Sequence, residues 1–168
     1  MTGYRKLGLL SLALVTLTSC TTVVAQAPGA AVGAQLSVER FLRASNQRDF
    51  TAMGRLFGTH DGAVMETGGT FGCAFKKIGS WFGGTACQKK ADVEIRMDAI
   101  ASILQHQDYQ VLRQQRVPGR SAPTTRIIVN LTTVDGAAVP DLPFVVVQTG
   151  DRRWLIEQVD LQRVMAAR

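Results

Sequence analysis

The sequence predicts an α+β domain in which helices pack on one antiparallel sheet. Residues 109–161 show the alternation of apolar and polar positions that is typical of half-buried strands. The clearest alternating set is Thr125, Ile127, Val129 and Leu131. Asp135-Gly136 is a tight-turn dipeptide between two of these runs. Because such a sheet has an apolar face to bury, we expect the helical patterns upstream to cover it.

The stretch before Cys20 has the layout of an export signal. Arg5-Lys6 is its positive end, an apolar run follows over residues 7–17, and the small Ser19 precedes the expected cleavage point. The apolar run is too short to span comfortably the roughly 30 Å hydrocarbon core of a bilayer. We therefore expect residues 1–19 to be a signal peptide that is removed on export.

The segment Leu17-Thr18-Ser19-Cys20 resembles the lipobox of bacterial lipoproteins. The resemblance implies a diacylglycerol thioether on Cys20, cleavage before it, and acylation of the new amino terminus. The alternative is an ordinary cleaved signal followed by a chance cysteine. Because two or more acyl chains hold a protein stably on a bilayer, the expected partner of Cys20 is a membrane of the cell envelope. Thr21 replaces the Asp of an inner-membrane retention signal, which favours the periplasmic face of an outer membrane, if one is present.

A tether and a mildly basic domain are expected after the lipid. Residues 20–35 are rich in Ala, Gly, Val and Pro without an amphipathic period, which predicts a flexible tether before a folded domain at 36–168. Removing Arg5 and Lys6 from the 19 basic side chains leaves 17 against 13 acidic ones, a net charge of +4. With no dense basic run and no nucleic-acid motif, this charge predicts a solvated surface and no nucleic-acid partner.

Two short helices and a third, longer one are expected before the sheet. Ser37 and Asp49 are candidate N-caps, and Leu36 lies where a hydrophobic staple would place it. Gly58 suits a left-handed cap at the end of the second helix. The third helix lies between residues 88 and 106. Its apolar stripe, which is typical of core rather than of a cofactor site, is Val93, Met97, Ile100 and Leu104.

A glycine-rich loop at residues 67–87 separates the second and third helices. Its glycine spacing fits no nucleotide-binding loop, and the sequence lacks the paired ligands of a zinc site. Since thiols of an exported chain oxidise, we predict a disulfide between Cys73 and Cys87, which contributes roughly 3 kcal/mol in the chain-entropy model. The loop's aromatic residues either close one end of the core or form an exposed interaction platform. They are Phe71, Phe75, Trp81 and Phe82, with Lys76, Lys77, Lys89 and Lys90 around them.

The order of elements resembles the nuclear transport factor 2-like superfamily, which includes ketosteroid isomerases and polyketide cyclases. Residues 38–57, as the helix pair, and 144–161, as the last hairpin, carry the resemblance, above all the run Trp154-Leu155-Ile156-Glu157-Gln158-Val159-Asp160. It implies a cone-shaped α+β fold whose curved antiparallel sheet carries the helices. The family usually has a strand where this chain has its cysteine loop, and Val64-Met65-Glu66 is the candidate remnant.

Two side chains are candidates for acid–base chemistry. Enzymes of this superfamily use an Asp base and a Tyr or protonated Asp that donates to an oxyanion, but no motif carries these roles over to this chain. Glu157 is a general-base candidate if its strand face is inward and a solvated charge if it is outward. Tyr109 either donates into the cone or packs its ring at a sheet edge. No hydrolase elbow or metalloprotease helix is present in the sequence, and we expect no metal and no cofactor.

These observations predict a non-catalytic, lipid-anchored envelope domain that binds a small apolar ligand or an envelope protein. The alternative is a cone-pocket isomerase or cyclase that uses a carboxylate general base. A purely structural envelope component is a third hypothesis. An open cone with a buried carboxylate would favour the enzyme, whereas a filled cone would favour binding.

Overall fold

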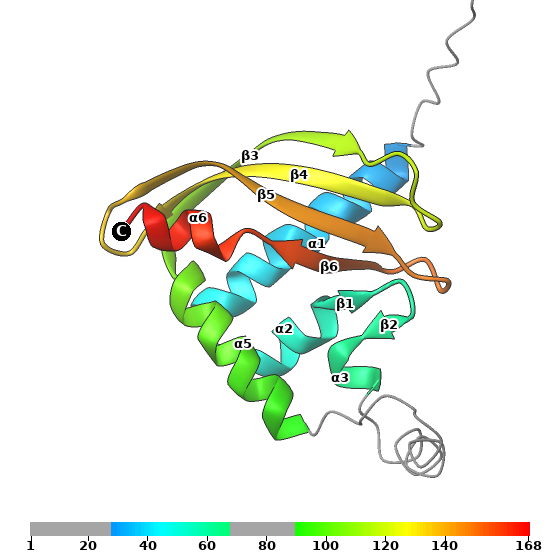
Figure 1. Ribbon diagram of the computed structural model, residues 1–168, viewed down its shortest axis with the longest axis horizontal. Helices are drawn as coiled ribbons and strands as arrows, with labels where there is room; N and C mark the ends of the chain where they lie inside the picture. The colour runs from blue at the N-terminus through cyan, green and yellow to red at the C-terminus, as the bar shows by residue number, and fades with distance from the viewer. Residues whose placement is uncertain (1–27, 68–89) are drawn as a thin grey trace, which may run out of the picture.

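The protein, described here from a computed structural model over residues 28–67 and 90–168, is built on a four-stranded sheet in the order β3-β4-β5-β6 (Figure 1). Every neighbouring pair of strands is antiparallel. Asp135-Gly136 forms the predicted turn, with a φ of 84° at Gly136. The strands are β3 (His106–Arg116), β4 (Thr124–Thr133), β5 (Ala138–Gln148) and β6 (Trp154–Val159). The predicted meander is therefore confirmed.

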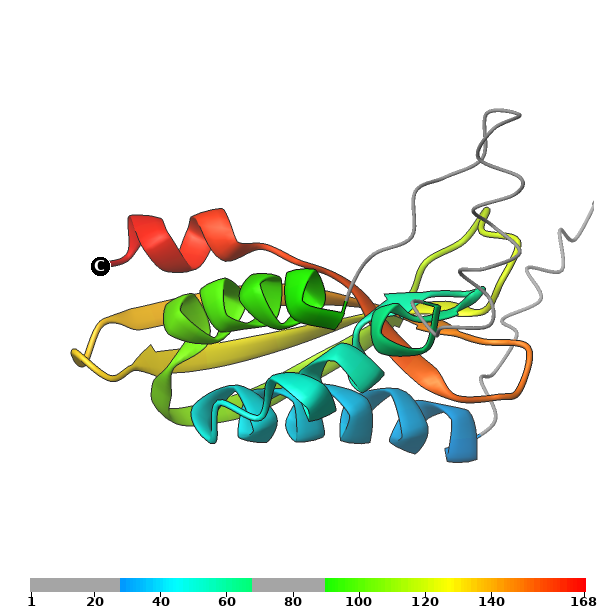
Figure 2. The same ribbon diagram turned by 90° about the horizontal axis from the view of Figure 1, so that it is seen from below.

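The helices pack mainly on one face of this sheet. Helix α1 (Pro28–Asn46) crosses all four strands, and α2 (Phe50–Leu56) and α5 (Lys90–Leu104) pack beside it. Figure 2 shows α1 on one side of the sheet and the last helix, α6 (Leu161–Ala166), on the other. A small unit ends the first described range, at residue 67. It consists of β1 (Gly58–Thr59), β2 (Gly62–Ala63) and α3 (Val64–Thr67). The predicted fold class, α+β with helices on a curved antiparallel sheet, is confirmed (Figure 1).

The core fills the space between α1 and the sheet. Helix side chains such as Phe41, Leu42 and Met53 meet sheet side chains such as Ile127 and Phe144, and all five have no exposed surface. The stripe predicted on the third helix is confirmed, with Val93, Met97 and Leu104 buried and Ile100 half-buried. None of the helices in the two described ranges is long and apolar enough to cross a membrane.

The start of the first helix corrects the predicted tether. Helix α1 begins at Pro28, so residues 28–35 are helical, and the domain starts earlier than residue 36. Ser37 is not an N-cap, because it lies in mid-helix, where its buried hydroxyl donates to the Trp154 carbonyl at 2.8 Å. Gly33 packs on the Trp154 indole, where an added Cβ would lie 2.8 Å from Cδ1. Packing against β6 thus stabilises a helix that the local composition does not predict.

The second helix confirms one predicted cap and corrects another. Asp49 is the N-cap of α2, and its carboxylate accepts a hydrogen bond from the Ala52 amide at 2.9 Å. Gly58 is not a left-handed cap. It lies in β1, where a Cβ would be 2.3 Å from the Gly62 carbonyl oxygen, so only glycine fits this close approach. The predicted strand remnant at Val64 is also wrong, because Val64 starts α3.

Candidate functional site

The two acid–base candidates lie on opposite edges of the sheet. Tyr109 belongs to β3 and Glu157 to β6, and β4 and β5 run between them. Tyr109 packs edge-to-face on His106, with ring centroids 5.5 Å apart, and burial raises the pKa of its hydroxyl. Glu157 is the extra residue of a bulge in β6 and forms an ion pair with Arg120. The two groups therefore do not meet at one reacting atom in this arrangement.

The helix-covered face of the sheet is filled by side chains. Leu142, Phe144 and Ile156 project from the strands into the core cluster formed with α1, and none of them is exposed. An enzyme of the cone-pocket kind needs an open cavity at this place, with a base and a donor aimed into it. In the described part of the chain, buried apolar side chains occupy this place.

A groove lies on the opposite face of the sheet, which we call the outer face. Alternation along β4 turns Arg126 and Ile128 away from α1, while Ile127 faces the core. Strand register then sets Pro143 beside Ile128, and Val145 beside Arg126. Helix α6 forms one wall of the groove, which is open to solvent and has a volume of about 680 Å³. This volume is in the range of about 300–1,000 Å³ found for small-molecule sites.

Asp141 lines the outer groove and has a strained backbone conformation. Asp141 has a φ of 51°, and its amide donates to the Asn130 side-chain oxygen at 3.0 Å. This conformation presents the Asp141 carboxylate to Arg113 at 3.1 Å and its carbonyl to Arg163 at 3.0 Å. Arg163 also lies 3.6 Å from the carboxylate of Asp160, which caps α6. Two of the three arginines of the groove are therefore paired.

Arg126 is the unpaired charge of the groove. Its side chain is exposed, and within residues 28–67 and 90–168 it has neither an ion pair nor a side-chain hydrogen bond. On the same face, Ile128 and Val145 give it an apolar surround. A guanidinium in this setting can pair with a carboxylate or phosphate at one end of a ligand whose body covers the apolar floor.

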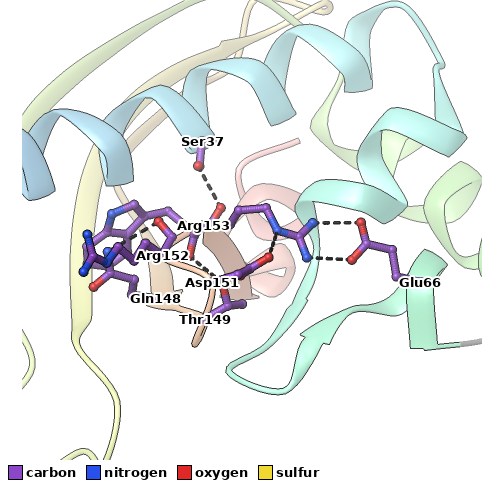
Figure 3. A network of polar contacts seen from close by, with 8 residues as sticks. Ser37, Glu66, Gln148, Thr149, Asp151, Arg152 and Arg153 are labelled. Atoms are coloured by element: carbon purple, nitrogen blue, oxygen red, sulfur yellow. Dashed lines mark hydrogen bonds and ion pairs between the residues drawn. The ribbon is translucent and has the colours of Figure 1, made fainter.

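A second polar cluster joins the β5–β6 hairpin to α3. Figure 3 shows Arg153 between two carboxylates: it contacts both Glu66 oxygens at 2.7 Å and an Asp151 oxygen at 2.6 Å. Hydrogen bonding to Arg153 lowers the pKa of Glu66. A hydrogen bond from the Thr149 hydroxyl is the main cause of the lowered pKa of Asp151, and a hydrogen bond from Arg153 adds to it. These pKa directions keep both carboxylates ionised and paired, so the cluster stabilises the hairpin. It has no free base to offer a substrate.

His60 and Asp61 lie near this cluster, in a cavity of about 460 Å³ that Glu66 and Arg153 also line. The His60 ring lies 3.1 Å from the Asp61 carboxylate, and both side chains are largely exposed. Within the described ranges, no group of three or more His, Cys, Asp or Glu is placed to hold a metal ion. The absence of a cofactor stays a prediction.

His106 is a buried group that the sequence did not single out as part of the core. It joins the end of α1 to β3, because its amide donates to the Asn46 side-chain oxygen at 3.1 Å. Its ring Nδ1 lies 2.8 Å from the Leu104 carbonyl. Burial is the main cause of the lowered pKa of His106. The ring is therefore held neutral, with Nδ1 as the donor to Leu104.

Because the pKa of His106 is lowered, we expect the free energy of unfolding to fall as the pH drops below about 6.5, the ordinary pKa of a histidine. A lowered folded pKa means that the unfolded chain binds the proton first, so the full stability is present above that pH and declines towards the folded pKa. Urea unfolding from pH 7.5 to 5 measures this decline. His60→Gln, at an exposed histidine, should keep the decline, whereas His106→Gln should remove it. Equal slopes in the two variants would contradict this role of His106.

Several predicted site residues lie outside the described residues. They are the lipidation site Cys20, the cysteines Cys73 and Cys87, and the loop aromatics Phe71, Phe75, Trp81 and Phe82. The signal peptide at 1–19 and the first part of the tether also lie there. The roles assigned to these residues stay predictions.

Comparison with known proteins adds little about the site. No protein-family model matches this chain. No curated protein matches its sequence. Among solved structures, it is similar to Aln2 from a Streptomyces species, with a TM-score of 0.39 and 13% sequence identity over 85% of this chain and 98% of that one. At this level the similarity assigns neither an activity nor a ligand.

Sequence reasoning missed the outer groove as a site. Alternation did place Ile127 and Val129 on one face, and so Arg126 and Ile128 on the other. It did not indicate that α6 would stop short of covering that other face. The signal that was available is Arg126, the single charged residue of β4, which stands next to the aliphatic run Ile127-Ile128-Val129. An arginine at such a position is uncommon unless it faces water or a ligand.

Proposed function

We propose that this protein is a lipid-anchored domain of the cell envelope that binds, without converting it, a small and mainly apolar ligand with an anionic group. The outer groove is the binding site, with Arg126 pairing the anion and Ile128, Pro143 and Val145 contacting the apolar part. The observation that carries the proposal is an unpaired guanidinium beside an apolar floor in a groove of about 680 Å³. Membrane attachment comes from the predicted lipid on Cys20.

The placement of side chains supports binding over the isomerase or cyclase alternative. The helix-covered face of the sheet, where a cone pocket would open, is occupied by buried residues such as Phe41 and Phe144. Glu157 pairs with Arg120, while Tyr109 lies on the other edge of the sheet. The other binding prediction, an envelope protein on the aromatic loop, depends on residues outside the described ranges and stays a prediction.

A pair of probes tests the groove. A soluble chain that starts at Thr21, and so lacks Cys20, is titrated with a fluorescent medium-chain fatty acid and with its methyl ester. We expect Arg126→Gln to weaken binding of the acid about tenfold, because a hydrogen bond to a charged group contributes about 1.5–3 kcal/mol and 1.4 kcal/mol is a factor of ten. Binding of the uncharged ester should change little.

Two further variants serve as controls. Val145→Asp places a charge on the groove floor and should weaken both probes, whereas Arg96→Gln removes an exposed arginine from α5 and should weaken neither. The absence of saturable binding of either probe would contradict the proposal. So would an Arg126→Gln variant that binds the acid as tightly as the wild type does.

A further inference from the structure

The exposed side of α1 has an unusual order of side chains along its length. At 100° per residue, Val32, Leu36, Arg40 and Arg43 fall within one sector of the helix surface. Buried residues such as Ala34, Val38 and Phe41 fall on the other side. Val32 is 57% exposed and Leu36 is 40% exposed. The solvent side of α1 therefore starts apolar and becomes basic two turns later.

The two arginines of this sector are free to pair outside the domain. Within the described parts of the chain, neither Arg40 nor Arg43 has an ion pair or a side-chain hydrogen bond. The single acidic residue of α1, Glu39, accepts a hydrogen bond from Gln35 at 2.8 Å. The sector therefore presents a net positive charge beside exposed apolar side chains, the combination that suits an anionic lipid surface.

The chain length brings this sector close to the expected anchor. Pro28 is eight positions after Cys20 in the sequence, and at about 3.5 Å per residue this stretch spans at most roughly 28 Å. If Cys20 carries acyl chains, the start of α1 cannot be farther than this from the bilayer. The apolar end of the sector, at Val32 and Leu36, is also the end nearest the anchor.

We propose that the exposed side of α1 lies on the membrane, with Val32 and Leu36 at the headgroup–acyl boundary and with Arg40 and Arg43 on lipid phosphates. The inference rests on the lipid anchor of the proposed function, and the surface that it names is independent of the groove. Because α1 and α6 lie on opposite sides of the sheet (Figure 2), this seating leaves the outer groove open to the aqueous compartment. A water-borne ligand then reaches Arg126 without crossing the lipid surface.

The test uses the full lipidated protein in vesicles. Leu36→Cys and, as the matched control, Ile95→Cys are labelled with an environment-sensitive fluorophore. Ile95 is 69% exposed and lies on α5. Signal from the parent protein, treated in the same way, is subtracted. The vesicles contain a nitroxide-labelled phospholipid, with either pure phosphatidylcholine or about one-third phosphatidylglycerol as the host lipid.

We expect strong quenching at position 36 and little at position 95, with the difference largest in the anionic vesicles. Each arginine near an anionic surface contributes about a fivefold preference. Arg43→Gln should therefore lower the ratio of seated to unseated protein about fivefold, and Arg40→Gln with Arg43→Gln about twenty-five-fold. Arg96→Gln, which removes an exposed arginine from α5, should leave the ratio unchanged.

Two results would overturn the inference: equal quenching at positions 36 and 95, or quenching at 36 that does not respond to loss of Arg40 and Arg43. Flotation of the same vesicles separates these failures from a failure of the anchor. A protein that floats but shows no selective quenching is anchored without seating α1. A protein that does not float lacks the anchor, and then the seating inference is lost with it.

Discussion

Trp154→Ala is expected to destabilise the domain by about 3–5 kcal/mol, the range for deleting a large buried aromatic side chain. The Trp154 side chain is 6% exposed and lies in the main core cluster. Gly33 of α1 packs on its indole ring, and the backbone carbonyl of Trp154 accepts a hydrogen bond from the Ser37 hydroxyl. Removing the ring therefore leaves a cavity where the first helix meets β6. Urea unfolding of the wild type and the variant measures the change in the free energy of unfolding.

A pair of glycine variants checks that the contact with α1 is responsible. Gly33→Ala should also be destabilising, although alanine favours a helix by about 1 kcal/mol over glycine, because its Cβ would lie 2.8 Å from the indole Cδ1. Gly150→Ala is the matched control, since no atom lies within 4 Å of the added Cβ. A loss of less than about 1 kcal/mol for Trp154→Ala, or a stabilising Gly33→Ala, would contradict the packing of α1 on the Trp154 indole.

Cys20→Ala is expected to abolish the lipid anchor. The cysteine is the only residue of the Leu17-Thr18-Ser19-Cys20 segment that can carry a thioether, so the variant cannot receive the diacylglycerol. Mass spectrometry of the amino-terminal peptide should show acyl chains on the wild type and none on the variant. In membrane fractionation the variant should no longer match the tight membrane association of the wild type.

Thr21→Ala is the control for this experiment, because it alters the next residue and keeps the cysteine. This variant should remain acylated and membrane-bound. A Cys20→Ala protein that is held as tightly as the wild type would show that another feature attaches the chain. An unmodified Cys20 in the wild type would show that the signal is an ordinary cleaved one.

The sheet and the third helix could be predicted because their residues repeat at regular spacing. Alternation of Ile127 and Val129 with their neighbours needs no partner to be recognised, and Asp135-Gly136 marks its turn locally. Val93, Met97 and Leu104 give the helical stripe in the same way. Helix α6 lacked such a signal, because a short helix offers too few turns for a period to be seen.

The candidate site was harder to predict, because irregularities in the strands decide where its side chains point. The bulge at Glu157 shifts the alternation of β6, so the positions of Leu155 and Val159 did not settle which way that carboxylate faces. Asp141 reaches Arg113 only through its left-handed backbone conformation. Neither feature has a reliable sequence signature when the residue is not glycine.

By itself, the sequence determined the α+β class, the antiparallel meander, the third helix, and the expectation of an export signal with a lipid on Cys20. Each of these depends on local spacing or on a short contiguous motif. Only the tertiary structure decided that α1 starts at Pro28, that the helix-covered face of the sheet is filled, and that Arg126 is left unpaired on the outer face. These outcomes depend on contacts between distant residues, such as Gly33 with Trp154, and a local pattern does not contain such contacts.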